Sequence, residues 1–143
     1  MKSQLQIKGL KTWTTLDGGG YQFNLYRDGK KVAFVHEAGE GGCLRVDWFD
    51  PVAEKDIQDY VKTLPDLKME DMDIVVKMSV DIFLDDLVAE YEWQKKLAKH
   101  RKGAVLFRFL TDPAQSFRAL KTPDVAKAVE YLDKKYPNQY VLV

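Results

Sequence analysis

Residues that could bind a phosphate gather between Asp17 and Gly42, a stretch that holds seven of the nine glycines in the chain. A P-loop needs a glycine, four further residues and then Gly-Lys followed by Ser or Thr. Around Gly29, the first position is Asn24 and Lys31 replaces the hydroxyl residue. The spacing of a dinucleotide-binding loop is also absent, and both glycine clusters precede strand-like sequence rather than a helix. We therefore expect these glycines to form turns.

Candidates for metal binding or nucleophilic catalysis are few. The two histidines, His36 and His100, lie far apart in sequence, and only Glu37 and Glu40 stand close to one of them. Cys43 could meet His36 if the segments around them paired as strands, but we expect a buried thiol that fills the core. The sequence therefore predicts no metal, no cofactor and no enzymatic activity. A single cysteine cannot form an internal disulfide, which favours a cytoplasmic setting.

Arg108 and Arg118 are the candidates for anion binding. If their strands form a hairpin with an even register, both side chains project from one face and lie opposite each other. Asp86 or Glu90 is then the expected internal partner. The alternative is that Arg108 and Arg118 bind a small ligand, such as a nucleotide-type signal.

A long helix is predicted from Ser79, a suitable N-cap, to about Lys102, before Gly103. The side expected to face the core carries Leu84, Leu87, Val88, Tyr91 and Ala98. A charged stripe contains Asp81, Asp85, Glu92, Lys96 and Lys99. A second apolar flank comprises Ile82, Trp93 and Leu97, with Asp86 and Glu90 beside it. Another part of the same domain could cover this flank, or it could bind a partner through a tryptophan ringed by charges.

The elements around these residues follow from periodicity. The first fifty residues alternate as strands, and Asp28-Gly29 predicts a tight hairpin turn. At Asp50-Pro51 the period changes to that of a helix, which ends near Pro65. Residues 66–73 read as an acidic connection, and the pattern does not decide whether residues 74–76 form a strand.

The remaining sequence predicts a central strand at 104–110, a returning strand at 117–120, a helix capped at Thr122-Pro123-Asp124 and a last strand at 140–143. The fold class is therefore α+β, with a mainly antiparallel sheet packed against about three helices. We expect one domain over residues 1–143, since this length suits a single core.

Composition narrows the possible partners. Residues are 45% hydrophobic and 12% aromatic, which favours a folded domain, and no apolar run could span a membrane. The N-terminus lacks the apolar block of a signal peptide. Twelve acidic residues and four lysines between Glu54 and Glu92 give that stretch a net charge of −8, although the whole chain is neutral. Nucleic acid is accordingly not an expected partner, and the basic segment "QKKLAKHRK" is kept only as a further alternative.

The segment "GLKTWTTLDGGGYQFNLYRDGKKVAFVHEAGEGGCLRVDWFD" resembles small accessory proteins of tailed bacteriophages and prophages, with a weaker likeness at "DIFLDDLVAEYE". The resemblance covers about the first third of the chain and brings no catalytic motif with it. It implies a bacterial cytoplasm during infection, where such proteins often bind a host enzyme or a defence component.

The function predicted from the sequence is therefore a non-enzymatic interaction protein that inhibits or redirects a host or anti-phage defence protein. The expected partner-binding residues are Asp81, Asp85, Asp86, Glu92 and Trp93. A homodimer is kept as an alternative. Small-ligand binding at Arg108 and Arg118 is the second function, and nucleic-acid binding the third.

Overall fold

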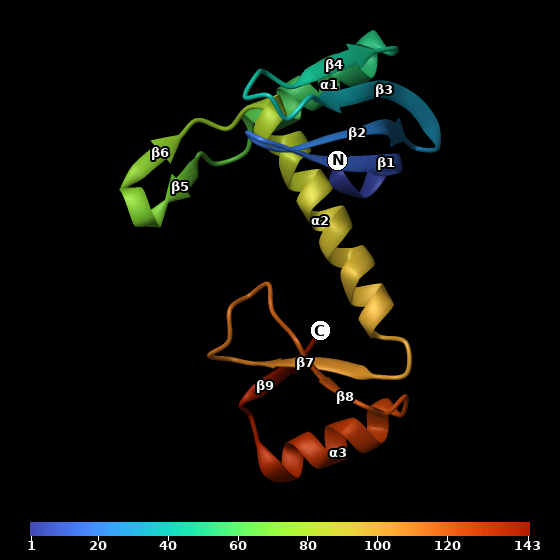
Figure 1. Ribbon diagram of the computed structural model, residues 1–143, viewed down its shortest axis with the longest axis vertical. Coiled ribbons are helices and arrows are strands. Elements are labelled where there is room, and N and C mark those ends of the chain that lie inside the picture. The colour runs from blue at the N-terminus through green and yellow to red at the C-terminus, as the bar shows by residue number, and fades with distance from the viewer. The chain divides into compact units, whose positions relative to one another are not determined.

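The computed structural model describes residues 1–143, with the side chain of Glu70 outside the description. It contains helices and antiparallel strands in an α+β arrangement, which confirms the predicted fold class (Figure 1). The chain groups into two compact units, Met1–Val88 and Ala89–Val143, and each is described by itself. That residues 1–143 behave as one domain stays a prediction.

The first unit is built on a four-stranded antiparallel sheet with the order β1-β2-β3-β4. Its elements are β1 (Leu5–Thr15), β2 (Gly18–Arg27), β3 (Lys30–Glu37), β4 (Arg45–Trp48), α1 (Pro51–Lys62), β5 (Leu67–Met69), β6 (Ile74–Val76) and the start of α2 (Val80–His100), with 3₁₀ turns at Lys2–Gln4 and Glu70–Met72. Asp28 and Gly29 both have positive φ, at 50° and 81°, as a tight turn between β2 and β3 requires. The predicted hairpin is confirmed.

One face of this sheet forms the core of the first unit. Alternation along β2 places Phe23 and Leu25 inward, where both are fully buried. They pack with Val35 of β3 and with apolar side chains of α1 and of the first turns of α2. The helix residues in this core are Ala53, Ile57, Val61, Phe83, Leu84 and Val88. The opposite face of the sheet contributes no residue to this core.

The two helices begin where the sequence predicts. A carboxylate oxygen of Asp50 accepts hydrogen bonds from the backbone N–H groups of Val52 and Ala53, at 3.0 and 3.2 Å. Ser79 Oγ accepts a hydrogen bond from the Ile82 N–H at 3.3 Å. Each cap satisfies N–H groups that have no partner inside the helix.

The predicted core stripe of α2 is right in its first half and wrong in its second half. Leu84 and Val88 are buried as expected, whereas Ala98 is exposed and Leu97 is buried. The boundary between the two units falls within α2, after Val88. A helix that contributes to two cores need not keep one apolar stripe along its length, and this explains the apparent second flank.

The second unit has a three-stranded antiparallel sheet with the order β8-β7-β9, and its strands are β7 (Val105–Phe109), β8 (Arg118–Leu120) and β9 (Tyr140–Leu142). The central position of β7 is confirmed. Helix α3 (Val125–Lys135) buries Ala128 and Leu132, while Leu106 is buried on β7. Asp124 caps this helix by accepting from the Lys127 N–H, so the cap is Asp124 rather than Thr122.

The segment between α1 and α2 forms a small hairpin of its own. Strands β5 and β6 pair with each other in a separate two-stranded sheet, and Asp73 at the turn has a φ of 50°. The predicted acidic connection is thus partly strand, and residues 74–76, which the sequence left undecided, are β6.

Candidate functional site

Glycines of the first unit allow one tryptophan to lie close to the backbone. Nε1 of Trp13 donates a hydrogen bond to the carbonyl oxygen of Ala38 at 3.1 Å. A Cβ on Gly20 would lie 2.2 Å from that nitrogen, and a Cβ on Gly39 would lie 2.9 Å from the backbone of Gly20. Thr15 Oγ1 donates to the carbonyl oxygen of Gly39. These contacts provide turns and close packing, as the sequence predicts for these glycines.

Cys43 and His36 do not form the pair that the sequence allowed. Strands β3 and β4 do pair, but His36 lies opposite Arg45. Cys43 precedes β4 and is exposed, so the expectation of a buried core thiol is wrong. The Gly-rich loop places it outside the sheet, where no apolar layer covers it. His36 instead lies between the rings of Trp13 and Phe34.

Two of the predicted partner-binding acids belong to a contact inside the first unit. The hydroxyl of Tyr21 donates a hydrogen bond to Asp85. Burial, and then this hydrogen bond, raise the pKa of Tyr21 above its ordinary value. Burial also raises the pKa of Asp81, and the nearby charges of Asp85 and Glu37 add to the effect. Asp85 and Asp86 are both exposed, but Asp85 is engaged by Tyr21 within the protein.

The other two predicted partner-binding residues lie in the second unit. Glu92 is exposed, but Trp93 is half-buried and its ring lies 5.9 Å from that of Phe117. The ammonium of Lys96 lies over both rings, 5.9 and 5.8 Å from their centroids. Trp93 therefore already has an aromatic neighbour and a cation, and it is not the bare anchor that the sequence suggested.

Arg108 and Arg118 project from opposite faces of their sheet, so the expected juxtaposition is wrong. Arg118 pairs in register with Phe107, whereas Arg108 pairs with Val141 of β9. The offset is one residue, and a one-residue offset reverses the face.

The partner of Arg118 is also a residue that the sequence analysis did not consider. Its Nε and Nη2 donate to the two carboxylate oxygens of Asp112 at 2.9 and 3.2 Å, and its guanidinium lies 4.6 Å from the centroid of Phe109. The hydrogen bond from Arg118 lowers the pKa of Asp112, and the N–H of Phe109 adds to the effect. Asp112 lies in the turn between the strands, six residues before Arg118, whereas the partners expected from sequence are Asp86 or Glu90.

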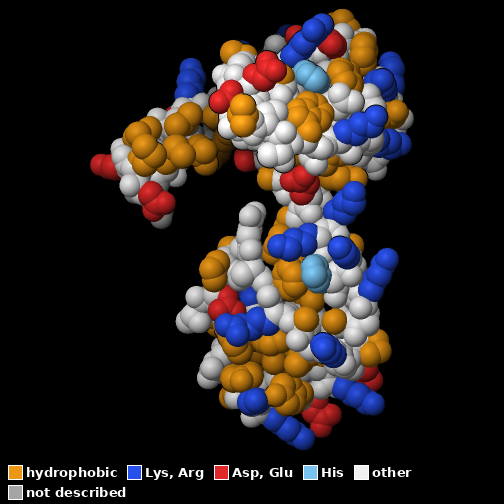
Figure 2. Space-filling model, viewed as in Figure 1, with side chains coloured by type: hydrophobic (Ala, Val, Ile, Leu, Met, Phe, Trp, Pro, Cys, Tyr) orange, Lys and Arg blue, Asp and Glu red, His pale blue; other side chains and the backbone are white. Residues whose placement is uncertain are grey.

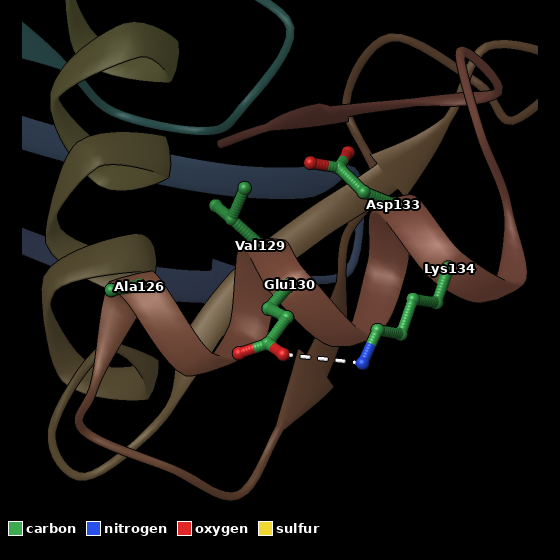
Figure 3. A pocket seen from close by; sticks show the side chains of 5 residues that line it. All are labelled: Ala126, Val129, Glu130, Asp133 and Lys134. Atoms are coloured by element: carbon green, nitrogen blue, oxygen red, sulfur yellow. Dashed lines mark hydrogen bonds and ion pairs between the residues drawn. The ribbon is translucent and has the colours of Figure 1, made fainter.

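A hollow of about 640 Å³ lies on α3 and is lined by Ala126, Val129, Glu130, Asp133 and Lys134 (Figure 3). All five residues come from this one helix. Glu130 and Lys134 form an ion pair at 3.2 Å, so their charges satisfy each other. Ligand sites usually combine an apolar enclosure with polar groups from several elements, and this hollow has neither.

The hairpin of β5 and β6 exposes a continuous apolar face. In register, Leu67 lies opposite Val76 and Met69 lies opposite Ile74, so these four side chains share one face. Leu67, Met69 and Ile74 are 41–44% exposed. We call Leu67, Met69, Ile74 and Val76 the hairpin apolar face. Figure 2 shows hydrophobic side chains gathered over β5 and β6.

The hairpin apolar face was not predicted from the sequence. Apolar residues alternate with other residues in both strands, at Leu67 and Met69 and again at Ile74 and Val76. This period of two could have identified both strands. Because acidic residues lie between the two strands, this segment was interpreted as a loop.

The described residues were also searched for a metal site and for a membrane-spanning helix. They contain no group of three or more His, Cys, Asp or Glu side chains that could hold a metal ion. None of the helices in the described part of the chain has the length and hydropathy needed to cross a bilayer.

Comparison with models of known families, with curated proteins and with solved structures finds no match.

Proposed function

We propose that this protein is a non-enzymatic binding protein that docks onto another protein through the hairpin apolar face. The observation that carries the proposal is the exposure of apolar residues on a two-stranded sheet. An isolated hairpin of two strands is at best marginally stable in water, and sheets normally bury one apolar face against another layer. A partner that covers this face supplies the missing layer.

The edges of the hairpin indicate the chemistry of that partner. Besides the hairpin apolar face, Met72 and Val75 are each 63% exposed. Asp66, Asp71 and Asp73 lie along the same segment, and Lys68 is on the opposite face from Met69. The matching surface on a partner is an apolar groove with basic residues at its rim. Methionine side chains adapt to such grooves because they are flexible and polarizable.

The base of the hairpin is fixed by a hydrogen bond. A carboxylate oxygen of Asp66 accepts from the backbone N–H of Met78 at 3.2 Å, which ties the two ends of the segment together. This hydrogen bond holds the hairpin together before a partner binds. Less conformational entropy is therefore lost when the partner covers the apolar face.

That the partner is a host or anti-phage defence protein rests on the resemblance to phage accessory proteins. Asp86 and Glu92 stay predicted contacts because both are exposed. Asp85 and Trp93 already have partners within their units, so the hairpin replaces them as the first surface to test.

The test compares capture by a tagged chain with capture by the double variant Met69→Thr/Ile74→Thr. Threonine keeps strand propensity while removing apolar surface. Burying a side chain such as Met or Ile gains about 1.5–3 kcal/mol, so the double variant should bind the captured protein more weakly by about tenfold or more. Lys68→Thr, on the opposite face, is the matched control and should capture normally.

Sedimentation of the purified chain distinguishes a second copy from another protein as the occupant. A mass that doubles with concentration in the wild type, and stays monomeric in Met69→Thr/Ile74→Thr, would assign the hairpin apolar face to a homodimer and contradict the proposal. A monomeric chain that captures one protein through this face supports it.

A further inference from the structure

The face of the β1–β4 sheet that lies away from the core carries cross-strand rows of aromatic and basic residues. In the register of the sheet, one row runs Lys11, Gln22, His36, Arg45 and the next runs Lys8, Asn24, Phe34, Asp47. Residues directly opposite each other on antiparallel strands point to the same face. We call these residues, together with Trp13, Tyr26 and Lys31, the outer sheet face.

The aromatic rings of the outer sheet face form a short row. The rings of Trp13 and His36 are 5.6 Å apart, and those of His36 and Phe34 are 6.4 Å apart with planes inclined by only 24°. All three are half-buried and belong to no part of the core of the first unit. Part of each side chain is therefore open to solvent.

Basic side chains surround this row. Lys8 Nζ lies 4.4 Å from the ring centroid of Tyr26, and Lys31 Nζ lies 5.2 Å from that of Phe49, which is itself 56% exposed. Lys11 is exposed beside them. Figure 2 shows lysine and arginine side chains next to hydrophobic ones over this sheet.

The outer sheet face carries one carboxylate, Asp47. Its Oδ1 lies 3.4 Å from Nε of Arg45 on the same strand, so this acid is already paired. Three other acids of the first unit, Glu37, Asp81 and Asp85, are near Tyr21 on the helix side of the sheet. The outer sheet face is therefore positive although the whole chain is neutral.

We propose that the outer sheet face binds single-stranded nucleic acid. Unpaired bases stack on exposed aromatic rings, and lysine and arginine side chains around them attract the phosphates. Trp13, His36 and Phe34 are the stacking residues, while Lys8, Lys11 and Lys31 neutralise the backbone. A duplex cannot offer its base faces to these rings, so the site selects single strands.

This inference differs from what the sequence predicted. The sequence placed any nucleic-acid contact on the basic segment "QKKLAKHRK", and the neutral net charge argued against such a partner. The outer sheet face collects its cations from three strands, two from β1 and one each from β3 and β4, so no run of basic residues marks it. The site is also separate from the hairpin apolar face, and the two proposals stand or fall independently.

The test measures fluorescence anisotropy with labelled oligothymidylate and oligouridylate of about 20 nucleotides. This length exceeds the roughly 4–16 nucleotides that a single-strand-binding OB fold covers. A duplex of the same length is the comparison. Phe34→Ala should weaken binding to the single strands by about 5- to 150-fold, the range for loss of one stacked base. The two single strands decide whether DNA or RNA is preferred.

A second variant tests the phosphate contacts. Lys8→Gln/Lys11→Gln should lower the slope of log affinity against log salt by about 1.4, since each phosphate contact on a single strand contributes about 0.7. Lys95→Gln/Lys96→Gln on α2 is the matched control and should leave the affinity unchanged. Circular dichroism checks that each variant folds.

Three results would overturn the proposal. The first is no saturable binding of either single strand up to about 100 μM protein, the weak end of nonspecific affinities. The second is binding that is unchanged in Phe34→Ala but lost in Lys95→Gln/Lys96→Gln. That result would place the nucleic-acid contact on α2. The third is equal affinity for the duplex.

Discussion

The indole of Trp13 occupies the space that a side chain at Gly20 would need: a Cβ there would lie 2.2 Å from Nε1 of Trp13 and 2.6 Å from the carbonyl oxygen of Glu37. Glycine is therefore required at this position by close approach, because any larger residue displaces either the indole or the neighbouring strand. The same approach brings Trp13 to the outer sheet face and to its hydrogen bond with Ala38.

Gly20→Ala should lower the free energy of unfolding by about 1–3 kcal/mol, the usual cost of overpacking. In a chain of this size, each kcal/mol corresponds to a fall in Tm of about 2–4 °C. Gly42→Ala is the control, because its Cβ would meet nothing within 4 Å, and it should stay within about 0.5 kcal/mol of wild type. Equal Tm values for the two variants would contradict the packing role of Gly20.

The hydrogen bond from Tyr21 to Asp85 gives a pH-dependent signature. The pKa of Tyr21 is raised in the folded protein, so its contribution to stability is complete below the unfolded value of about 10 and is lost as the pH rises further. Tyr21→Phe should lower stability at neutral pH by about 0.5–1.5 kcal/mol. Urea unfolding above pH 10 should show a shallower loss in Tyr21→Phe than in wild type, and parallel curves would contradict the assignment.

The ion pair between Asp112 and Arg118 predicts an acid-sensitive second unit. The pKa of Asp112 is lowered in the folded protein, so its stabilising contribution is present above the unfolded value of about 3.9 and disappears as the pH falls through the lower folded value. Asp112→Asn should therefore lose less stability than wild type when the pH is taken from 5 to about 2. A steeper loss in the variant would show that Asp112 is not stabilising. Glu92→Gln, at an exposed position of the second unit, serves as the control for general charge effects.

The local signals in the sequence predicted much of the fold. The turn and both helix starts depend on contacts between residues that are close in sequence, so they could be derived from Asp28-Gly29, Asp50-Pro51 and Ser79. Features that depend on distant parts of the chain were missed. The face of Arg118 depends on a one-residue register, the exposure of Cys43 depends on what covers its loop, and Leu97 is buried because α2 contributes to two cores.

The candidate sites could be predicted less well for the same reason. Asp85 and Trp93 look available on a helical projection, but Tyr21 and Phe117 reach them from other elements. Both surfaces proposed for binding emerge only when register is known, since each combines residues from different strands.

Helix α2 supplies Phe83, Leu84 and Val88 to the core of the first unit and Leu97 to the second. Unfolding this helix removes buried groups from both, so we expect one cooperative transition over residues 1–143. Leu97→Ala should cost about 2–5 kcal/mol and lower the Tm of that single transition. Calorimetry tests for a single transition, for which the van't Hoff and calorimetric enthalpies of unfolding are equal. Two resolved transitions would contradict the single-domain prediction.

The most direct measurement of the proposed function is the affinity of a captured, purified partner for wild-type chain and for Met69→Thr/Ile74→Thr. We expect the double variant to bind more weakly by about tenfold or more while its fold and Tm are retained. Equal affinity of the two chains for the partner would contradict docking through the hairpin apolar face.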